Sequence, residues 1–176
     1  MAKKTIDTSA DREAVKRYLQ QYHVAKNKKH ILEVRHRVLA EELKSPAPGS
    51  RFRTVPASRP VNPDGSVSVV FRIAEVEERI DDQREEMAKA VLHVMDMIDL
   101  LPQNSMERTV VELRHIDCKR WEQIAREVYM SRSRVNDYYN AALDLLLTFK
   151  RTKRLVGDYM AREDERAAQQ QDSTSV

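Results

Sequence analysis

The stretch that decides the fold is residues 100–149, LLPQNSMERTVVELRHIDCKRWEQIAREVYMSRSRVNDYYNAALDLLLTF. Proline is accepted in the first turn of a helix, so Pro102 predicts a helix beginning around 103–105. A second, short helix over RWEQIAREV runs into the turn Tyr129-Met130-Ser131, and a third, longer helix follows. Two helices joined by a turn of three or four residues are typical of a helix-turn-helix.

The second and third helices of this stretch each carry an apolar stripe at helical spacing. Ala125 is expected where the two helices approach closely, and Ser131 is well placed to cap the third helix through the amide of Ser133 or Arg134. The predicted core positions are Trp121, Ile124, Ala125 and Val128 on the second helix, and Val135, Tyr138, Ala142, Leu145, Leu146 and Phe149 on the third.

The side chains left outside this core suit nucleic-acid recognition. The first two turns of the third helix reach base edges in this motif, where Arg bonds guanine and Asn bonds adenine. A generic helical bundle with a solvated basic face is the alternative. The expected base-reading residues are Arg132, Ser133, Asn136, Asp137 and Asn140, and the expected DNA-backbone contacts are Lys119, Arg120, Gln123, Arg134, Lys150 and Arg151.

Upstream, apolar residues repeat in a strict heptad between Val69 and Leu101. A helix with such a seam needs a partner. The N-terminal helix expected up to about Lys44 has a similar seam that Lys29 and His36 interrupt, so an antiparallel helical hairpin is predicted. A parallel coiled-coil dimer through residues 69–101 explains the heptad equally well. The heptad positions are Val69, Ile73, Val76, Ile80, Gln83, Met87, Ala90, Val94, Met97 and Leu101.

The predicted organisation is all-α. Residues 1–101 form the hairpin or coiled-coil region, with a linker at 45–68 that holds five of the six prolines. Proline lacks the backbone donor that a helix needs, so no helix is expected to cross this linker. Residues 102–156 form the helix-turn-helix domain, and the polar residues 157–176 are expected to form a fraying helix and a disordered tail.

Composition excludes several classes of protein. The formal net charge is only +3, but residues 102–154 hold eleven Lys and Arg against seven Asp and Glu, so the helix-turn-helix stretch is locally basic. No phosphate-binding glycine loop exists, and Cys118 and the five histidines lack metal-ligand spacing. The histidines are expected at helix surfaces. We therefore expect no enzyme, metal or cofactor. No membrane-spanning stretch or signal peptide is evident, so we expect a cytoplasmic protein.

The sequence from Leu101 to Leu146 resembles region four of bacterial sigma factors, in its LP, its ERxVxxLR helix, its WxxIA and its SxxxV. It is closer still to phage-encoded regulators of the ArpU/RinA type, which have a similar layout upstream. The resemblance implies control of phage late or packaging genes, with RNA polymerase as a possible partner. Such sequences usually have Gly at the positions of Cys118 and Tyr129, and Ser or Thr as a cap at the position of Arg120.

Three functions follow from these patterns. The leading one is a sequence-specific transcriptional regulator that binds double-stranded DNA, forms a homo-oligomer, with a dimer favoured, and acts in a bacterial host cell. A small terminase-type DNA-packaging subunit and a protein-only adaptor with a region-four-like fold are the alternatives. A complete sigma factor is not expected, because no aromatic-rich promoter-opening segment precedes residue 102.

Overall fold

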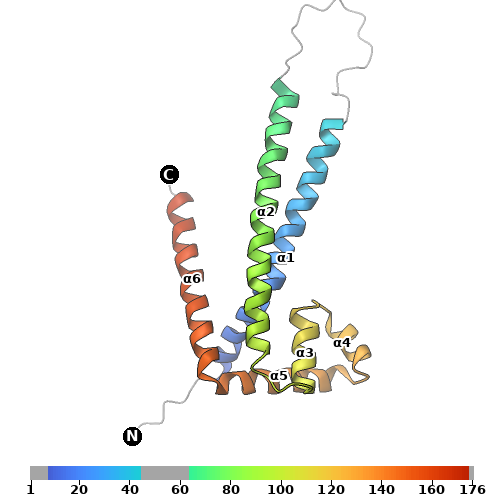
Figure 1. Ribbon diagram of the computed structural model, residues 1–176, viewed down its shortest axis with the longest axis vertical. Coiled ribbons are helices and arrows are strands. Elements are labelled where there is room, and N and C mark those ends of the chain that lie inside the picture. The colour runs from blue at the N-terminus through green and yellow to red at the C-terminus, as the bar shows by residue number, and fades with distance from the viewer. Residues whose placement is uncertain (1–7, 45–63, 175–176) are drawn as a thin grey trace, which may run out of the picture. The chain divides into compact units, whose positions relative to one another are not determined.

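The computed structural model describes residues 8–44 and 64–174, with side chains from 9–44 and 67–169. Within these residues the regular secondary structure is entirely helical, which confirms the predicted all-α class. The helices are α1 (Thr8–Lys44), α2 (Asp64–Ile98), α3 (Met106–His115), α4 (Trp121–Glu127), α5 (Arg132–Thr148) and α6 (Lys150–Thr174) (Figure 1). The chain divides into two compact units. The first holds residues 1–24 and 89–176, and the second holds residues 25–88.

In the second unit, the later part of α1 and the earlier part of α2 run antiparallel (Figure 1). Two ion pairs join the helices. His36 Nε2 lies 2.9 Å from Glu77 Oε1, and Arg72 Nη2 lies 3.4 Å from Glu42 Oε2. As the residue number rises from 36 to 42 on α1, it falls from 77 to 72 on α2, as an antiparallel pair requires. The pairing within one chain therefore accounts for the heptad seam in this unit.

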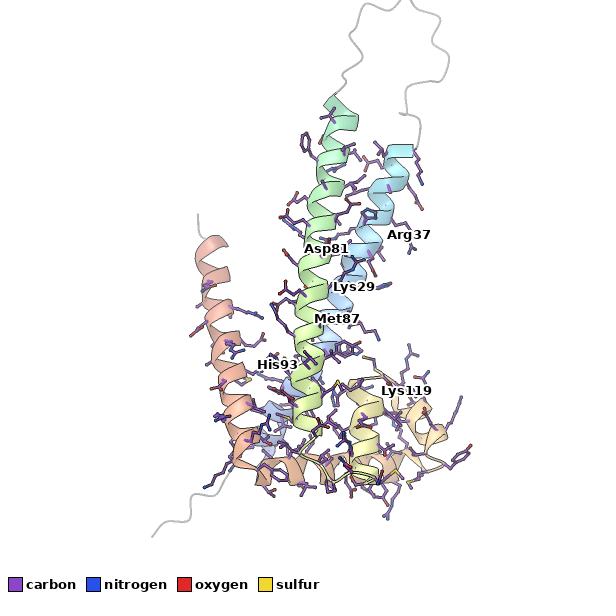
Figure 2. The ribbon with its side chains drawn as sticks, in the orientation of Figure 1. Lys29, Arg37, Asp81, Met87, His93 and Lys119 are labelled. Atoms are coloured by element: carbon purple, nitrogen blue, oxygen red, sulfur yellow. The ribbon has the colours of Figure 1, made fainter. Side chains whose placement is uncertain are left out.

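Burial along α2 follows the heptad. All ten positions named in the sequence are buried or half-buried, including the single polar member, Gln83. On α1, Lys29 and His36 fill the gaps between apolar seam residues and are both half-buried. Figure 2 shows Lys29 and Met87 between the two helices. Near the end of α1, Leu43 is 43% exposed.

The predicted linker at 45–68 is too long at its C-terminal end. Residues 45–63 lie outside the described part of the chain, but α2 begins at Asp64, so residues 64–68 are helical. The physical reason is visible in the sequence. Pro63 is the last proline before Pro102, so every residue from 64 onward can donate its amide to a helical hydrogen bond.

The first unit packs α3, α4, α5 and the start of α6 with the first turns of α1 and the last turns of α2 around one core. Tyr18 of α1 meets Tyr159 of α6 edge to face, with ring centroids 5.5 Å apart. Arg12 of α1 forms a two-pronged ion pair with Asp144 of α5, with both N–O distances 2.6 Å. The largest fully buried side chains of this core include Leu19, Met97, Ile98, Ile124, Leu143 and Leu146.

Helix α6 continues to Thr174, across residues expected to be a fraying helix and a disordered tail. Its first half is held by packing, because Val156 is buried and Leu155, Tyr159 and Met160 lie against the core. Residues 161–169 are exposed. The helix extends past the core because no glycine or proline follows Gly157 to end it.

Candidate nucleic-acid interface

Helices α4 and α5 are joined by four residues, 128–131, in a tight turn. The amide of Met130 donates to the carbonyl of Ala125 at 2.9 Å, which closes the end of α4. Ser131 has extended backbone geometry, and its hydroxyl accepts from the amide of Arg134 at 3.3 Å. Ser131 therefore caps α5, as predicted, and fixes where its exposed first turns begin.

The turns before α4 and before α5 both contain a non-glycine residue in left-handed geometry. The φ angles are 56° at Cys118 and 54° at Tyr129. These are the two positions where region-four sequences usually have Gly, which adopts this geometry without a Cβ penalty. Asn104, before α3, also has a positive φ of 63°, a geometry that asparagine tolerates well. Cys118 and Tyr129 therefore hold a left-handed geometry to which their side chains are poorly suited.

Helix α4 begins at Arg120 without a side-chain cap of the usual kind. Arginine has no hydrogen-bond acceptor, so it cannot serve the amides of the first turn. Instead, Gln123 Oε1 accepts from the amide of Arg120 at 2.9 Å, which is one half of a capping box. The side-chain oxygen of Gln123 is therefore engaged by the protein, although this residue was predicted as a DNA-backbone contact.

The core stripe of α5 differs from the prediction at several positions. Leu143 is fully buried although it was not predicted, whereas Leu145 and Phe149 are only half-buried. Tyr139, not Tyr138, is buried in the core at 6% exposure. Tyr138 is only half-buried, and Arg134 lies over its ring at 5.0 Å. Neighbouring helical positions differ by only 100°, so an apolar stripe does not decide which of two adjacent tyrosines faces inward. Trp121 decides it here, because its ring packs edge to face on Tyr139 at 5.0 Å.

A buried histidine completes this aromatic cluster. His115 is 3% exposed, and its Nε2 lies 3.0 Å from the hydroxyl of Tyr139. The expectation that all five histidines lie at helix surfaces is therefore wrong for His115. Burial, with Arg114 nearby, lowers the pKa of His115 to about 3, and burial raises the pKa of Tyr139 to about 12. Both side chains are thus neutral at physiological pH, and the cluster is a packing element between α3 and α5.

The first half of α5 presents a polar row opposite the core. Ser133, Asp137 and Asn140 are exposed and Asn136 is half-buried. Within the described part of the chain, none of these four side chains has a hydrogen bond or ion pair. Their donors and acceptors are therefore free to meet a ligand. All four belong to the predicted base-reading set, and the structure brings them onto one helical face.

The fifth predicted base-reading residue, Arg132, is engaged. Its Nη1 lies 3.0 Å from Glu122 Oε1 of α4, and the two side chains are 62% and 57% exposed. An exposed pair of this kind is weak, so it orients Arg132 without immobilising it. Arg132 is therefore presented beside the polar row but with its charge partly balanced.

The predicted DNA-backbone contacts do not form one group. Lys119 is paired with Glu127 at 2.7 Å and Asp117 at 3.2 Å, which raises the pKa of its ammonium and balances its charge. Lys150 and Arg151 begin α6, beyond the far end of α5. That helix has 17 residues, so the two cations lie about 25 Å along its axis from Arg132.

Arg126 is a cation that sequence reasoning missed. It is exposed on α4, three residues after Gln123, and so shares that residue's face. No ion pair involves it within the described residues, in contrast to Lys119. The sequence could have indicated Arg126, because residues three positions apart on a helix lie side by side and Gln123 was a predicted contact. Arg120, Arg126 and Arg134 are therefore exposed cations around α4 and α5 that have no carboxylate partner among the described residues.

Comparisons of the chain with models of protein families, with curated proteins and with solved structures give no match. Among the described residues, no cluster of His, Cys, Asp and Glu is arranged to hold a metal ion. No helix in the same ranges has a stretch long and apolar enough to span a bilayer.

Proposed function

We propose that this protein is a sequence-specific regulator of transcription that binds double-stranded DNA with a helix-turn-helix formed by α4 and α5. The observation that carries the proposal is the polar row of Ser133, Asn136, Asp137 and Asn140, which is accessible and has no partner within the described residues. In a helix-turn-helix, the recognition helix packs its apolar side against the domain core and places its outer polar side chains in the major groove.

The chemistry of the row supports base readout. Asn136 and Asn140 can each donate to and accept from adenine, and Arg132 can bond guanine in a bidentate manner. Asp137 can accept from the amino group of cytosine, while its charge disfavours a position near phosphate. Such a row discriminates between base pairs, whereas a uniformly basic helix would bind any sequence.

The surrounding charge supports docking on the phosphate backbone. Residues 119–140 hold five Lys and Arg against three Asp and Glu, and Arg120, Arg126 and Arg134 lack carboxylate partners within the described residues. Side chains that flank the recognition helix in this motif meet phosphates and set its register on the duplex. Few free cations imply modest non-specific affinity, so base contacts must supply much of the binding.

The resemblance to sigma region four extends the proposal. It implies a phage-encoded protein acting in the cytoplasm of a bacterial host, with RNA polymerase as a second partner. In this proposal, the paired helices α1 and α2 are not part of the DNA-binding surface. A protein-only adaptor role would leave the polar row of α5 without a function.

The deciding experiment is selection of DNA fragments from a random pool by the purified chain, followed by sequencing. A single enriched motif is expected for the wild-type protein. Asn136→Ala should lose preference at one adenine of that motif, while Asp158→Ala, exposed on α6 away from the polar row, should select the wild-type motif. Absence of any enrichment would instead support the adaptor.

A small terminase-type packaging subunit is the second candidate. A packaging subunit would also bind DNA through α4 and α5, but it would have to form a larger oligomer. Exposed aliphatic side chains on α1 and α2 favour oligomer formation. A closed ring, established by native mass spectrometry, would support the packaging role. Open or small assemblies would support the regulator.

A further inference from the structure

A row of exposed aliphatic side chains follows the outer side of α1 in the second unit. Ile31, Val34 and Val38 are spaced by three and four residues, so they share one face of the helix, and they are 52%, 41% and 57% exposed. Lys29 lies in the seam with α2, whereas Arg37, next to Val38, lies on the side turned away from α2 (Figure 2). We call these three residues the outer row of α1.

Helix α2 carries a corresponding outer row, formed by Val67, Phe71 and Ala74. All three are exposed, Val67 by 48% and Phe71 by 72%. Their spacing of four and three places them on one face, opposite the seam positions Val69 and Ile80, which are buried. An exposed phenylalanine flanked by aliphatic positions indicates a surface that a partner covers.

The two outer rows match each other when the helices run antiparallel. The spacings on α1 are three then four, and those on α2, taken in the reverse direction, are also three then four. Each side chain therefore meets one counterpart in the same layer. The paired layers are Ile31 with Ala74, Val34 with Phe71, and Val38 with Val67.

Charge favours the same pairing. The outer row of α1 is flanked by Lys28, His30, Arg35 and Arg37, whereas α2 continues beyond its outer row with Glu78, Asp81 and Asp82. In the matched alignment, Lys28 falls level with residue 77, one residue from Glu78. Both side chains are exposed, and neither has an ion pair within the described residues. Two copies of the α1 row would instead bring cations against cations, which opposes that pairing.

One chain cannot join its own two outer rows, because each lies on the side of its helix opposite the shared seam. The alignment also differs by about eight residues from the one inside the chain, where Glu42 meets Arg72. We propose that the outer row of α1 docks against the outer row of α2 from a second copy of this chain. Because the two surfaces differ, the contact is head-to-tail, and each copy offers one free surface of each kind.

The proposal is tested with two variants of the full chain, Val34→Glu and Phe71→Glu, each of which places a carboxylate in one outer row. Light scattering and native mass spectrometry of the wild type are expected to show mass that rises with concentration beyond a dimer. Each variant alone is expected to be a monomer. Ala88→Glu adds the same charge at an exposed position of α2 outside the row, and should assemble like the wild type.

Mixing the two variants provides the sharpest result. Val34→Glu keeps an intact α2 row and Phe71→Glu keeps an intact α1 row, so an equimolar mixture should give a one-to-one dimer and nothing larger. A wild type that stays monomeric at every attainable concentration overturns the proposal. So does a Phe71→Glu variant that still assembles, because that result assigns the contact to two copies of α1.

A charge exchange tests the alignment. Lys28→Glu and Glu78→Lys should each weaken assembly at least several-fold, and the double variant should recover it, with recovery lost as salt rises. Circular dichroism at matched concentration verifies that each variant stays helical. A double variant that is weaker than both single variants would overturn the proposed alignment.

Discussion

Arg132 of α5 is paired with Glu122 of α4 at 3.0 Å, so the residue best suited to read guanine is balanced by a carboxylate in the unbound protein. In the proposed function, binding to DNA would exchange this carboxylate for a base edge. The charge of Glu122 therefore affects how readily the guanidinium of Arg132 can bind a ligand.

Replacement of Glu122 by Gln should strengthen DNA binding several-fold, because it removes a negative charge near phosphate and frees Arg132. Folding stability should change by less than about 1 kcal/mol, since exposed ion pairs contribute little. Fluorescence anisotropy with the selected DNA at two salt concentrations measures the effect. Glu165→Gln, on the exposed part of α6, is the matched control, and an unchanged affinity for Glu122→Gln would contradict the expectation.

Acid should destabilise the protein through His115. Its pKa is about 3 when folded, against an ordinary value near 6.5, so the unfolded chain binds more protons between these limits. The stabilisation is complete above about pH 6.5 and is lost as pH falls toward 3, by at most a few kcal/mol.

Urea unfolding at pH 7, 5.5 and 4.5 checks this dependence, and His115→Gln should flatten it. His93→Gln, at an exposed position of α2, should retain the wild-type slope. An equal slope in His115→Gln would place the acid sensitivity elsewhere.

The two adjacent tyrosines of α5 should respond differently to loss of the hydroxyl. Tyr139→Phe leaves His115 Nε2 without its partner in the core, which costs roughly 1–3 kcal/mol. Tyr138 is half-buried, and within the described residues its hydroxyl has only a long bond from Arg134, at 3.4 Å. The effect of Tyr138→Phe should therefore stay within about 0.5 kcal/mol. Chemical denaturation of both variants makes the comparison, and equal losses would mean that Tyr139 is not the core residue.

Glycine at position 129 should stabilise the protein. Tyr129 holds a φ of 54° while its side chain is 95% exposed, so the substitution removes backbone strain without removing packing. The strain is worth roughly 1–2 kcal/mol, less the added flexibility of glycine in the unfolded chain. Thermal unfolding measures the gain. Asn140→Gly inside α5 should instead lose roughly 0.3–0.5 kcal/mol, the difference in helix propensity between the two residues. A loss at position 129 would assign the tyrosine side chain a contact.

Features that depend on neighbours along the chain could be predicted from the sequence. The heptad in α2, the break at Pro102, the Ser131 cap and the strained positions Cys118 and Tyr129 all follow from local periodicity, backbone chemistry or resemblance to region four. The polar row of α5 also follows, because the core stripe leaves it on the outside. These features depend on the spacing of residues only a few positions apart, and that spacing can be read from the sequence.

Features that depend on contacts between distant segments could not be predicted in this way. The choice of Tyr139 over Tyr138 depends on Trp121, and the burial of His115 depends on packing between α3 and α5. The balancing of Lys119 by Glu127 and the helical extension through α6 likewise escaped sequence reasoning. The physical reason is that a 3.6-residue period identifies a face only to within about one residue, and charges pair through space.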